Sequence, residues 1–171
     1  MTRGSSCAST RDRARQRVVD DRRATIDDVA VFLSSFSFLV LLGVGGGGLG
    51  RAYAIALGVA GGNVVVNDIN PDTAAETVKI INDAGGQAIV NLDDITDYAS
   101  AGKILTTTIE HFGDVHAVVN NAGNNRDRMF TSLTEDDWDD VIRVHLKGHF
   151  CLSSHAAKYW REKSKNGENP D

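Results

Sequence analysis

Apolar residues in this chain recur in short blocks, and longer segments with a helical period separate these blocks. Val64 to Val66 form one β-branched block, and the range 115–120 forms another. Between them, Asn70-Pro71 pairs a good N-cap with proline at the first helical position, which predicts a helix to about Ala84. The pattern therefore predicts strands that alternate with helices.

The full pattern predicts strands over 36–42, 64–66, 87–92 and 115–120, and helices over 51–59, 70–84, 97–112 and from Thr134 to about Lys163. Strands joined by single helices favour βαβ units with right-handed crossovers. Nearly continuous valine and isoleucine predict strands that are buried on both faces. We therefore expect an α/β fold, a Rossmann-type doubly wound parallel sheet that is incomplete, with about four strands.

Two helices carry more detailed expectations. In the helix over 51–59, the apolar face is predicted to comprise Ala52, Ile55, Ala56 and Val59. The last helix opens on Thr134-Glu135-Asp136-Asp137, which resembles a capping box with Leu133 as the hydrophobic staple.

The first 35 residues differ from the rest of the chain. Seven arginines and few apolar residues fall within residues 1–28, which predicts a disordered or foreign extension. The apolar run 29–44 leaves two interpretations open, a targeting or membrane-associated segment or a run that contains the first core strand. It is shorter than the roughly 20 residues that span a bilayer. We place the α/β domain at 36–163 and a polar tail at 164–171.

Composition excludes several classes of function. The net charge is −5 over 171 residues, so no nucleic-acid partner is expected. Cys7 and Cys151 have no metal-type spacing, and we expect neither a metal site nor a disulfide framework. Such cysteine usage suits a reducing, cytoplasmic compartment.

A glycine-rich run lies between the first predicted strand and the first predicted helix. In Gly45–Gly50 the missing side chains let the backbone approach a pyrophosphate, and the following helix offers free N–H groups. The alternative is a flexible loop, since a glycine run alone is weak evidence. Its position favours phosphate binding by Gly45, Gly48, Leu49 and Gly50.

Asp68 ends the next strand, 18 residues after Gly50. This spacing is close to that of the carboxylate that binds an adenosine ribose in dinucleotide-binding sheets. A carboxylate there accepts hydrogen bonds from both ribose hydroxyls and repels a 2′-phosphate. The sequence therefore predicts NAD as the cofactor, with NADP disfavoured.

Several motifs resemble those of the short-chain dehydrogenase/reductase family. Asn120-Asn121-Ala122-Gly123 is similar to that family's signature, and Asp94-Ile95-Thr96-Asp97 to its adenine-contacting turn. The segments 124–130 and 143–148 resemble a narrower branch, which includes the (3R)-hydroxyacyl-CoA dehydrogenase part of type 2 peroxisomal multifunctional enzymes and its bacterial relatives. The resemblance covers about 39–161.

The resemblance implies roles for individual residues. The glycine loop would hold the pyrophosphate and Asp68 the ribose. Asp94 and the Ile95 backbone would meet adenine, and the path to the nicotinamide would be lined by Asn120, Ala122 and Gly123. His145 falls at the family's proton-relay position, with a packing histidine as the alternative. The family also implies a small-molecule substrate and a homo-oligomer, and its peroxisomal members give an alternative location.

Two departures from the family pattern bear on function. Aligned without a gap, Gly43 and Val44 stand where the family has Thr-Gly; alternatively, Gly43 is that glycine and the loop is one residue too long. Either alignment puts cofactor affinity in doubt. The family's serine and Tyr-x-x-x-Lys follow a fifth strand, and this sequence stops before one. Tyr159 and Lys163 match Tyr-x-x-x-Lys, but no strand or serine turn intervenes, so we expect them on a solvent or interface face.

These observations lead to one main functional hypothesis and an alternative. The resemblance implies hydride transfer between NAD and a 3-hydroxyacyl thioester or a similar secondary alcohol or ketone, with no turnover by this chain as written. The alternative is a non-catalytic nucleotide-binding fragment or interaction module.

Overall fold

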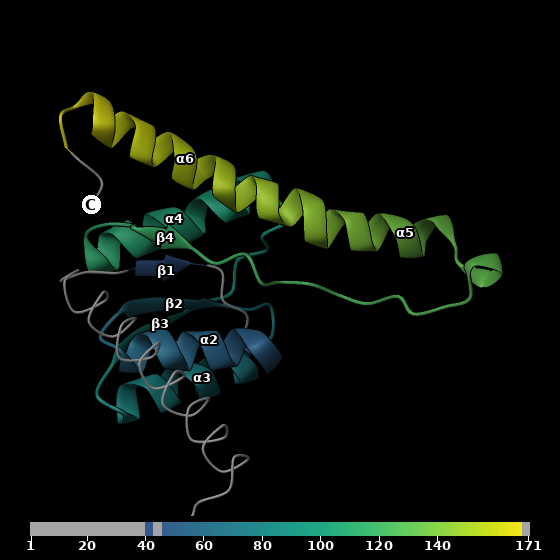
Figure 1. The fold of residues 1–171 in the computed structure, drawn as a ribbon, viewed down its shortest axis with the longest axis horizontal. Helices are drawn as coiled ribbons and strands as arrows, with labels where there is room; N and C mark the ends of the chain where they lie inside the picture. The colour runs from purple at the N-terminus through teal and green to yellow at the C-terminus, as the bar shows by residue number, and fades with distance from the viewer. Residues whose placement is uncertain (1–39, 43–45, 169–171) are drawn as a thin grey trace, which may run out of the picture.

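Four strands form one parallel sheet in the order β3-β2-β1-β4 (Figure 1). The computed structural model describes residues 40–42 and 46–168. Its elements are β1 (Val40–Leu42), α2 (Gly48–Val59), β2 (Asn63–Asn67), α3 (Pro71–Asp83), β3 (Gln87–Asn91), α4 (Tyr98–Phe112), β4 (Ala117–Val118), η1 (Phe130–Ser132), α5 (Glu135–Ile142), η2 (Arg143–Gly148) and α6 (His149–Lys165). The predicted parallel α/β sheet is confirmed.

Some predicted boundaries change. β4 covers Ala117–Val118 instead of 115–120, and α2 begins three residues before the predicted start. α6 continues to Lys165, two residues into the predicted polar tail. The predictions for residues 1–35, and for the part of the first strand before Val40, lie outside the described residues.

The sheet is covered on both faces, and its central strand β2 is wholly buried. Val65 belongs to an apolar cluster with Ile104 and Leu152, from α4 and α6. Val64 and Val66 point the other way, into a cluster formed with α2 and α3. Figure 1 shows the two helical layers on opposite sides of the sheet. This burial explains the continuous valines, because a strand with two buried faces needs no polar alternation.

The buried face of α2 differs from the prediction. Val59 is 56% exposed, and the buried residues are instead Gly50, Ala54 and Gly58. A Cβ at Gly58 would lie 2.4 Å from Cγ2 of Ile81, so the missing side chain lets α3 pack directly against α2. Apolar periodicity missed this face because close approach of two helices selects small side chains over apolar ones.

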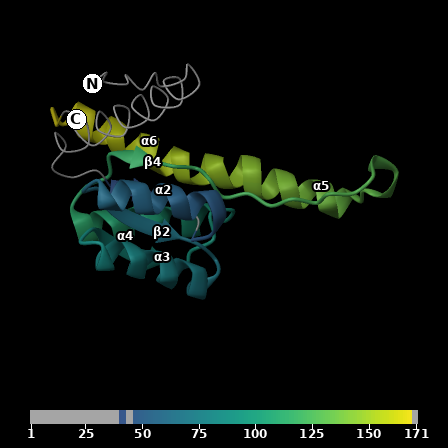
Figure 2. The ribbon, with the colours of Figure 1, turned by 60° about the horizontal axis from the view of Figure 1, so that its bottom comes forward.

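The last helical region is one long rod with an irregular middle. Thr134 and Asp137 form the predicted capping box, and α5 then passes into the π-helical segment η2 and on into α6. α6 packs along α4, whereas α5 projects beyond the sheet (Figures 1 and 2). The rod therefore joins the core at one end and overhangs an edge of the sheet at the other.

Residues just before β4 hold α6 in place. The hydroxyl of Tyr159 donates to Oδ1 of Asp114 at 2.7 Å, and Lys163 forms an ion pair with the same carboxylate. The indole N–H of Trp160 donates to the carbonyl of Val115 at 2.6 Å. Burial raises the pKa of Asp114, but hydrogen bonds from Lys163 and Tyr159 outweigh it and leave the pKa below its usual value. The carboxylate is thus a charged anchor for α6.

The packing of α2 on α3 gives a first test. Gly58→Val should lower the free energy of unfolding by about 2–3 kcal/mol, because the new side chain overlaps the buried Ile81. Ala52→Val introduces the same residue on the exposed face of α2, where we expect a loss below about 1 kcal/mol. Urea denaturation of both variants measures the difference. Equal losses would show that the two helices do not meet at Gly58.

Candidate functional site

The carboxyl ends of all four parallel strands meet at one edge of the sheet. Gly46 and Gly47 follow β1, Asp68 follows β2, Asp94 follows β3, and the segment 121–123 follows β4. In open parallel sheets, ligands bind in the crevice outside this edge, where crossovers leave in opposite directions from neighbouring strands. Here β1 leads to α2 on one face, and β4 leads toward the α5–α6 rod on the other.

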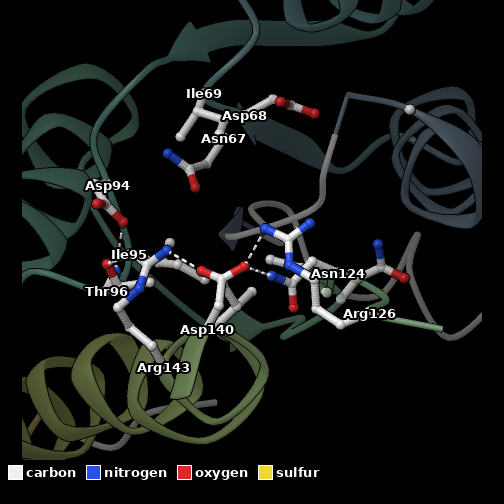
Figure 3. Close-up of a pocket in the computed structure, with 15 residues that line it drawn as sticks. Asn67, Asp68, Ile69, Asp94, Ile95, Thr96, Asn124, Arg126, Asp140 and Arg143 are labelled. Atoms are coloured by element: carbon white, nitrogen blue, oxygen red, sulfur yellow. Dashed lines mark hydrogen bonds and ion pairs between the residues drawn. The ribbon is translucent and has the colours of Figure 1, made fainter. Parts of the chain in front are cut away.

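A cavity of about 480 Å³ lies at this edge (Figure 3). Its walls come from the turns after all four strands and from the rod that overhangs them. The lining residues are Gly47, Asn67, Asp68, Ile69, Asp94, Ile95, Thr96, Asn121, Ala122, Gly123, Asn124, Arg126, Asp140, Arg143 and Val144. The volume falls in the range of pockets that hold cofactors and drug-sized ligands.

Asp68 is tied directly to the glycine turn. The backbone N–H of Gly46 donates to Oδ2 of Asp68 at 2.7 Å, and that of Asn70 donates to Oδ1 at 2.9 Å. An ionised carboxylate has about four acceptor sites, so two remain for ligand hydroxyls. The first turn and the carboxylate of the second strand therefore form one unit with acceptor capacity left over.

Gly46 is also fixed from its carbonyl side. Its oxygen accepts hydrogen bonds from Oγ1 of Thr77 at 2.7 Å and Nε of Arg51 at 3.1 Å. A Cβ at Gly46 would lie 2.6 Å from the backbone nitrogen of Ala74 in α3. Since backbone cannot yield as a flexible side chain does, this position requires glycine.

The ends of β2 and β3 are held by a buried amide network. Nδ2 of Asn67 donates to Oδ1 of Asn91 at 2.7 Å and to the carbonyl of Asp93 at 2.9 Å. Nδ2 of Asn91 in turn donates to Oδ2 of Asp93 at 2.9 Å. A satisfied polar network of this kind fixes one geometry, because breaking it leaves buried groups unpaired. It sets the separation between Asp68 and the turn that contains Asp94.

The turn after β3 is closed by its own side chains. Oδ1 of Asp94 accepts from the backbone N–H of Thr96 at 2.7 Å, and Asp97 caps α4 by accepting from Ser100. Ile95, between them, is 9% exposed and packs into the core cluster of α4 and α6. The turn therefore presents the Asp94 carboxyl and its backbone to the cavity on a rigid base.

A charged group from the rod forms the opposite wall (Figure 3). Asp140 pairs with both Arg126 and Arg143, and it accepts from Nδ2 of Asn124 at 2.6 Å. The hydrogen bond from Arg143 and the smaller contribution of Arg126 hold the pKa of Asp140 below its usual value against burial. Arg143 also donates to Oγ1 of Thr96 at 2.9 Å, which ties the rod to the turn after β3.

One acceptor on this wall has no partner among the described residues. Oδ1 of Asn124 is buried and makes no hydrogen bond there. A buried amide oxygen without a donor carries a desolvation cost of about 1–3 kcal/mol.

The structure brings together half of the sequence-predicted cofactor residues. Asp68, Asp94, Ile95, Ala122 and Gly123 all line the cavity.

Four of the other predicted residues do not line the cavity. The side chain of Asn120 points to α6, where Nδ2 donates to Oγ of Ser153 at 2.8 Å. Gly48, Leu49 and Gly50 form the first turn of α2 without lining the cavity. The predictions for Gly43, Val44 and Gly45 lie outside the described residues.

His145 meets the turn after β4 but does not line the cavity. Its Nε2 is 2.8 Å from the carbonyl oxygen of Asn124 and 3.0 Å from the same residue's backbone nitrogen. His149 follows four residues later, and its Nε2 is 2.9 Å from the carbonyl oxygen of Ala122. Both imidazoles thus hold the backbone of the segment 122–124 in place.

Tyr159 and Lys163 lie at the amino-terminal edge of the sheet, beside Asp114 before β4. Burial, followed by the bond to Asp114, raises the pKa of Tyr159 well above its usual value. A general base needs a lowered pKa and a place near the cofactor, and Tyr159 has neither. The expected solvent or interface face is wrong, because the ring packs on the core and Lys163 is 17% exposed. The pair is a structural anchor.

Sequence reasoning missed several residues of the site. The sequence does not distinguish Gly46 from the other glycines of its run. Only its contacts with Asp68 and α3 in the structure show that this position is special. Asn67 left a usable signal, because a polar residue in an otherwise apolar buried strand needs a partner. Asp140 and Arg143 stand three residues apart, a spacing of opposite charges that is common on exposed helices. This spacing therefore did not indicate a site.

Comparison with known proteins places the chain in a family. The short chain dehydrogenase family model matches residues 39–168. The chain is 43% identical to the hydroxyacyl-CoA dehydrogenase ChsB1 of Mycobacterium tuberculosis, over 71% of this chain and 39% of that protein. It is 37% identical to the peroxisomal multifunctional enzyme type 2 of Mus musculus, over 74% of this chain and 18% of that protein.

A solved structure agrees with these matches. A short chain dehydrogenase from Mycobacterium avium superimposes with a TM-score of 0.73 at 42% identity, over 77% of this chain and 49% of that one. The chain thus spans less than half the length of these relatives. The matching region contains all four strands and the whole cavity, and the chain accordingly belongs to the short-chain dehydrogenase family.

Proposed function

We propose that the cavity at the carboxyl edge binds NAD, with Asp68 as the ribose acceptor and the turn at Gly46 and Gly47 beside the pyrophosphate. The observation that carries this proposal is the hydrogen bond from the Gly46 N–H to Asp68. It holds a glycine turn beside a carboxylate that keeps acceptor sites for a ligand, at the N-terminus of α2. The first turn of α2 has no acidic residue to compete with a phosphate. The family binds NAD or NADP, which supports a dinucleotide here.

Charge supports NAD over NADP. The cavity walls carry three carboxylates, from Asp68, Asp94 and Asp140, against two guanidinium groups, from Arg126 and Arg143. Both guanidinium groups are paired with Asp140. A 2′-phosphate on the ribose would meet Asp68 without an unpaired cation among the described lining residues. The repulsion between the 2′-phosphate and the Asp68 carboxylate makes NADP the weaker ligand.

The other predicted positions fit the remainder of a dinucleotide. Asp94 and the backbone of Ile95 stand where adenine would lie next to a ribose held by Asp68. Ala122, Gly123 and Asn124 also line the cavity, and we assign Ala122 and Gly123 to its nicotinamide side. NAD supplies the hydride chemistry when bound, and this chain's residues bind it, orient it and limit its contact with water.

For the whole protein we propose hydride transfer between NAD and a 3-hydroxyacyl thioester or a similar secondary alcohol or ketone. The relatives' names support this class, since ChsB1 is a hydroxyacyl-CoA dehydrogenase. For the 171-residue polypeptide alone we propose cofactor binding without turnover, because its Tyr-x-x-x-Lys lies at the opposite edge of the sheet from the cavity. It then acts as a nucleotide-binding unit.

Family members act on small molecules and are commonly oligomeric. Exposed apolar side chains on the rod fit self-association here: Trp138, Leu146 and Phe150 are each more than half exposed. In the part of the chain that the structure describes, no helix is long and apolar enough to cross a membrane. Some relatives are peroxisomal and others bacterial, and we propose a cytoplasmic location.

Titration with NADH tests the binding proposal. We expect saturable fluorescence enhancement, and Asp68→Ala should weaken it about 10-fold to 100-fold by removing two hydrogen bonds to the ribose. Asp83→Ala removes an exposed carboxylate at the far end of α3 and should leave affinity unchanged. The same Asp68→Ala change should narrow the preference for NADH over NADPH. Equal affinities for the parent chain and both variants would rule out ribose binding by Asp68.

Adjacent glycines provide a matched pair for the turn. Gly46→Ala should weaken NADH binding by about 10-fold or more, since the new methyl group pushes the turn away from α3. Gly47→Ala has no atom near its Cβ and an extended φ of −120°, so the turn keeps its geometry. Because Gly47 lines the cavity, the new methyl group should still weaken NADH binding, but less than Gly46→Ala does. Thermal unfolding of each variant separates a local shift from loss of the fold. A reversed order of the two effects would contradict the assigned turn geometry.

Substitution of Tyr159 tests the absence of turnover. The 171-residue polypeptide should oxidise 3-hydroxyacyl-CoA no faster than a protein-free blank. Tyr159→Phe should reduce stability by about 1.5–3 kcal/mol, by removing a hydrogen bond to a charged group, with NADH affinity unchanged. Turnover by the parent chain that disappears in Tyr159→Phe would show that Tyr159 is catalytic after all.

A further inference from the structure

A cluster of hydroxyl and amino groups lies outside the cavity, where the start of α4 meets α6. Tyr98 is the first residue of α4, and Ser154 and Lys158 stand one turn apart on α6. Oη of Tyr98 is 3.2 Å from Oγ of Ser154, and Nζ of Lys158 donates to it at 2.6 Å. None of these residues lines the cavity described above. One phenol oxygen thus meets an ammonium group and a hydroxyl group together.

The position of the phenol ring is fixed from several sides. Nε2 of His155 is 2.8 Å from the carbonyl oxygen of Tyr98, and the two rings stack with their centroids 4.2 Å apart. A Cβ at Gly102 would lie 3.1 Å from the His155 ring, so the glycine makes room for the imidazole. Asp97 accepts from Ser100 and fixes the start of α4. The ring is therefore held in place with its oxygen toward α6.

This arrangement favours the phenolate form. The hydrogen bond from Lys158, then that with Ser154, lowers the pKa of Tyr98, while burial and the nearby Cys151 act weakly against them. The other titratable group of α6 against the ring is His155, which contacts the backbone of Tyr98 and not its oxygen. A lowered pKa beside a fixed cation is the usual way in which a protein activates a weak nucleophile.

We propose that Tyr98 is a nucleophilic tyrosine, a modification site that accepts acyl or sulfonyl groups from activated donors through its phenol oxygen. In this step Oη forms a bond to the carbonyl carbon or sulfur of the donor. The bond to the leaving group breaks, and the leaving group departs with its electron pair. The phenol proton passes by way of Ser154 to water, and Lys158 keeps its charge throughout. No oxidant or reductant is needed.

The chain carries its own reference tyrosines. Tyr53 is 43% exposed, more than Tyr98, and has no such partners among the described residues. Tyr159 donates to Asp114, which raises its pKa and suppresses the phenolate. If access alone governed reactivity, Tyr53 would react first. If the contacts of the phenol oxygen govern it, the order is Tyr98, then Tyr53, then Tyr159.

The experiment treats the 171-residue chain with a limiting amount of an aryl sulfonyl fluoride near neutral pH and maps the label by peptide mass spectrometry. We expect Tyr98 to be labelled several-fold faster than Tyr53, because the contacts of its phenol oxygen with Lys158 and Ser154 favour the phenolate. Labelling of Tyr53 at the same or a higher rate would overturn the proposal. So would a label that goes to Lys158 instead of the phenol oxygen.

Variants of α6 test the cause of the reactivity. Lys158→Met should slow the labelling of Tyr98 to about the rate of Tyr53, because it removes the hydrogen bond from the ammonium group to the phenol oxygen. Lys165→Met, which removes a lysine of the same helix that pairs with Glu162, should leave the rate unchanged. Equal rates in both variants would overturn the role of the ammonium group. Circular dichroism checks the fold of each, and if Lys158→Met fails to fold, the comparison of Tyr98 with Tyr53 in the parent chain still decides.

Discussion

The contact between the Gly46 N–H and the Asp68 carboxylate is the interaction on which the rest of the site depends. It joins the turns after two neighbouring strands, and the Gly46 carbonyl joins the same turn to α3 through Thr77. Loss of this contact would release the glycine turn and the ribose acceptor from each other. The buried network at Asn67 and Asn91 then sets the distance to the next turn.

The carboxyl edge of the sheet forms the cavity, and the amino edge anchors α6. At the carboxyl edge, the strand turns and the charged group around Asp140 surround a cavity in which the Asp68 carboxylate keeps acceptor sites, and the amide oxygen of Asn124 has no partner within the described part of the chain. At the amino edge, Asp114 accepts a hydrogen bond from Tyr159 and pairs with Lys163, and these contacts hold α6 in place. Because α6 continues the same rod as α5, this anchor also positions the wall of the cavity at the other end. Stability and binding are thus linked through one helix.

Local patterns predicted what local physics decides. The N-cap at Asn70, the capping box at Thr134 and the buried valines of β2 follow from hydrogen bonding and burial within a few residues, and all three are present in the structure. The α/β class followed from their alternation. Asp68 was predicted from its spacing after the glycine run and Asp94 from the family resemblance, and the structure brings both to the carboxyl edge of the sheet.

Features that depend on contacts distant in sequence could not be predicted in this way. The buried face of α2 is set by Ile81 on another helix, and the special status of Gly46 is set by the backbone of α3. The same applies to Tyr159, which the sequence placed on a solvent or interface face and which its partner Asp114 holds against the core at the other edge. Spacing within a motif says which side chains are neighbours, but not which edge of the sheet they face.

Amide chemical-shift mapping with NADH tests the central claim most directly. If a dinucleotide lies along the carboxyl edge, addition of NADH will shift the amide resonances of Gly46, Asp68, Ile95 and Gly123 in a saturable manner. Those of Asp114 and Tyr159 at the opposite edge will not move. Shifts confined to the amino edge, or none that saturate, would contradict the assignment of this cavity as a dinucleotide site.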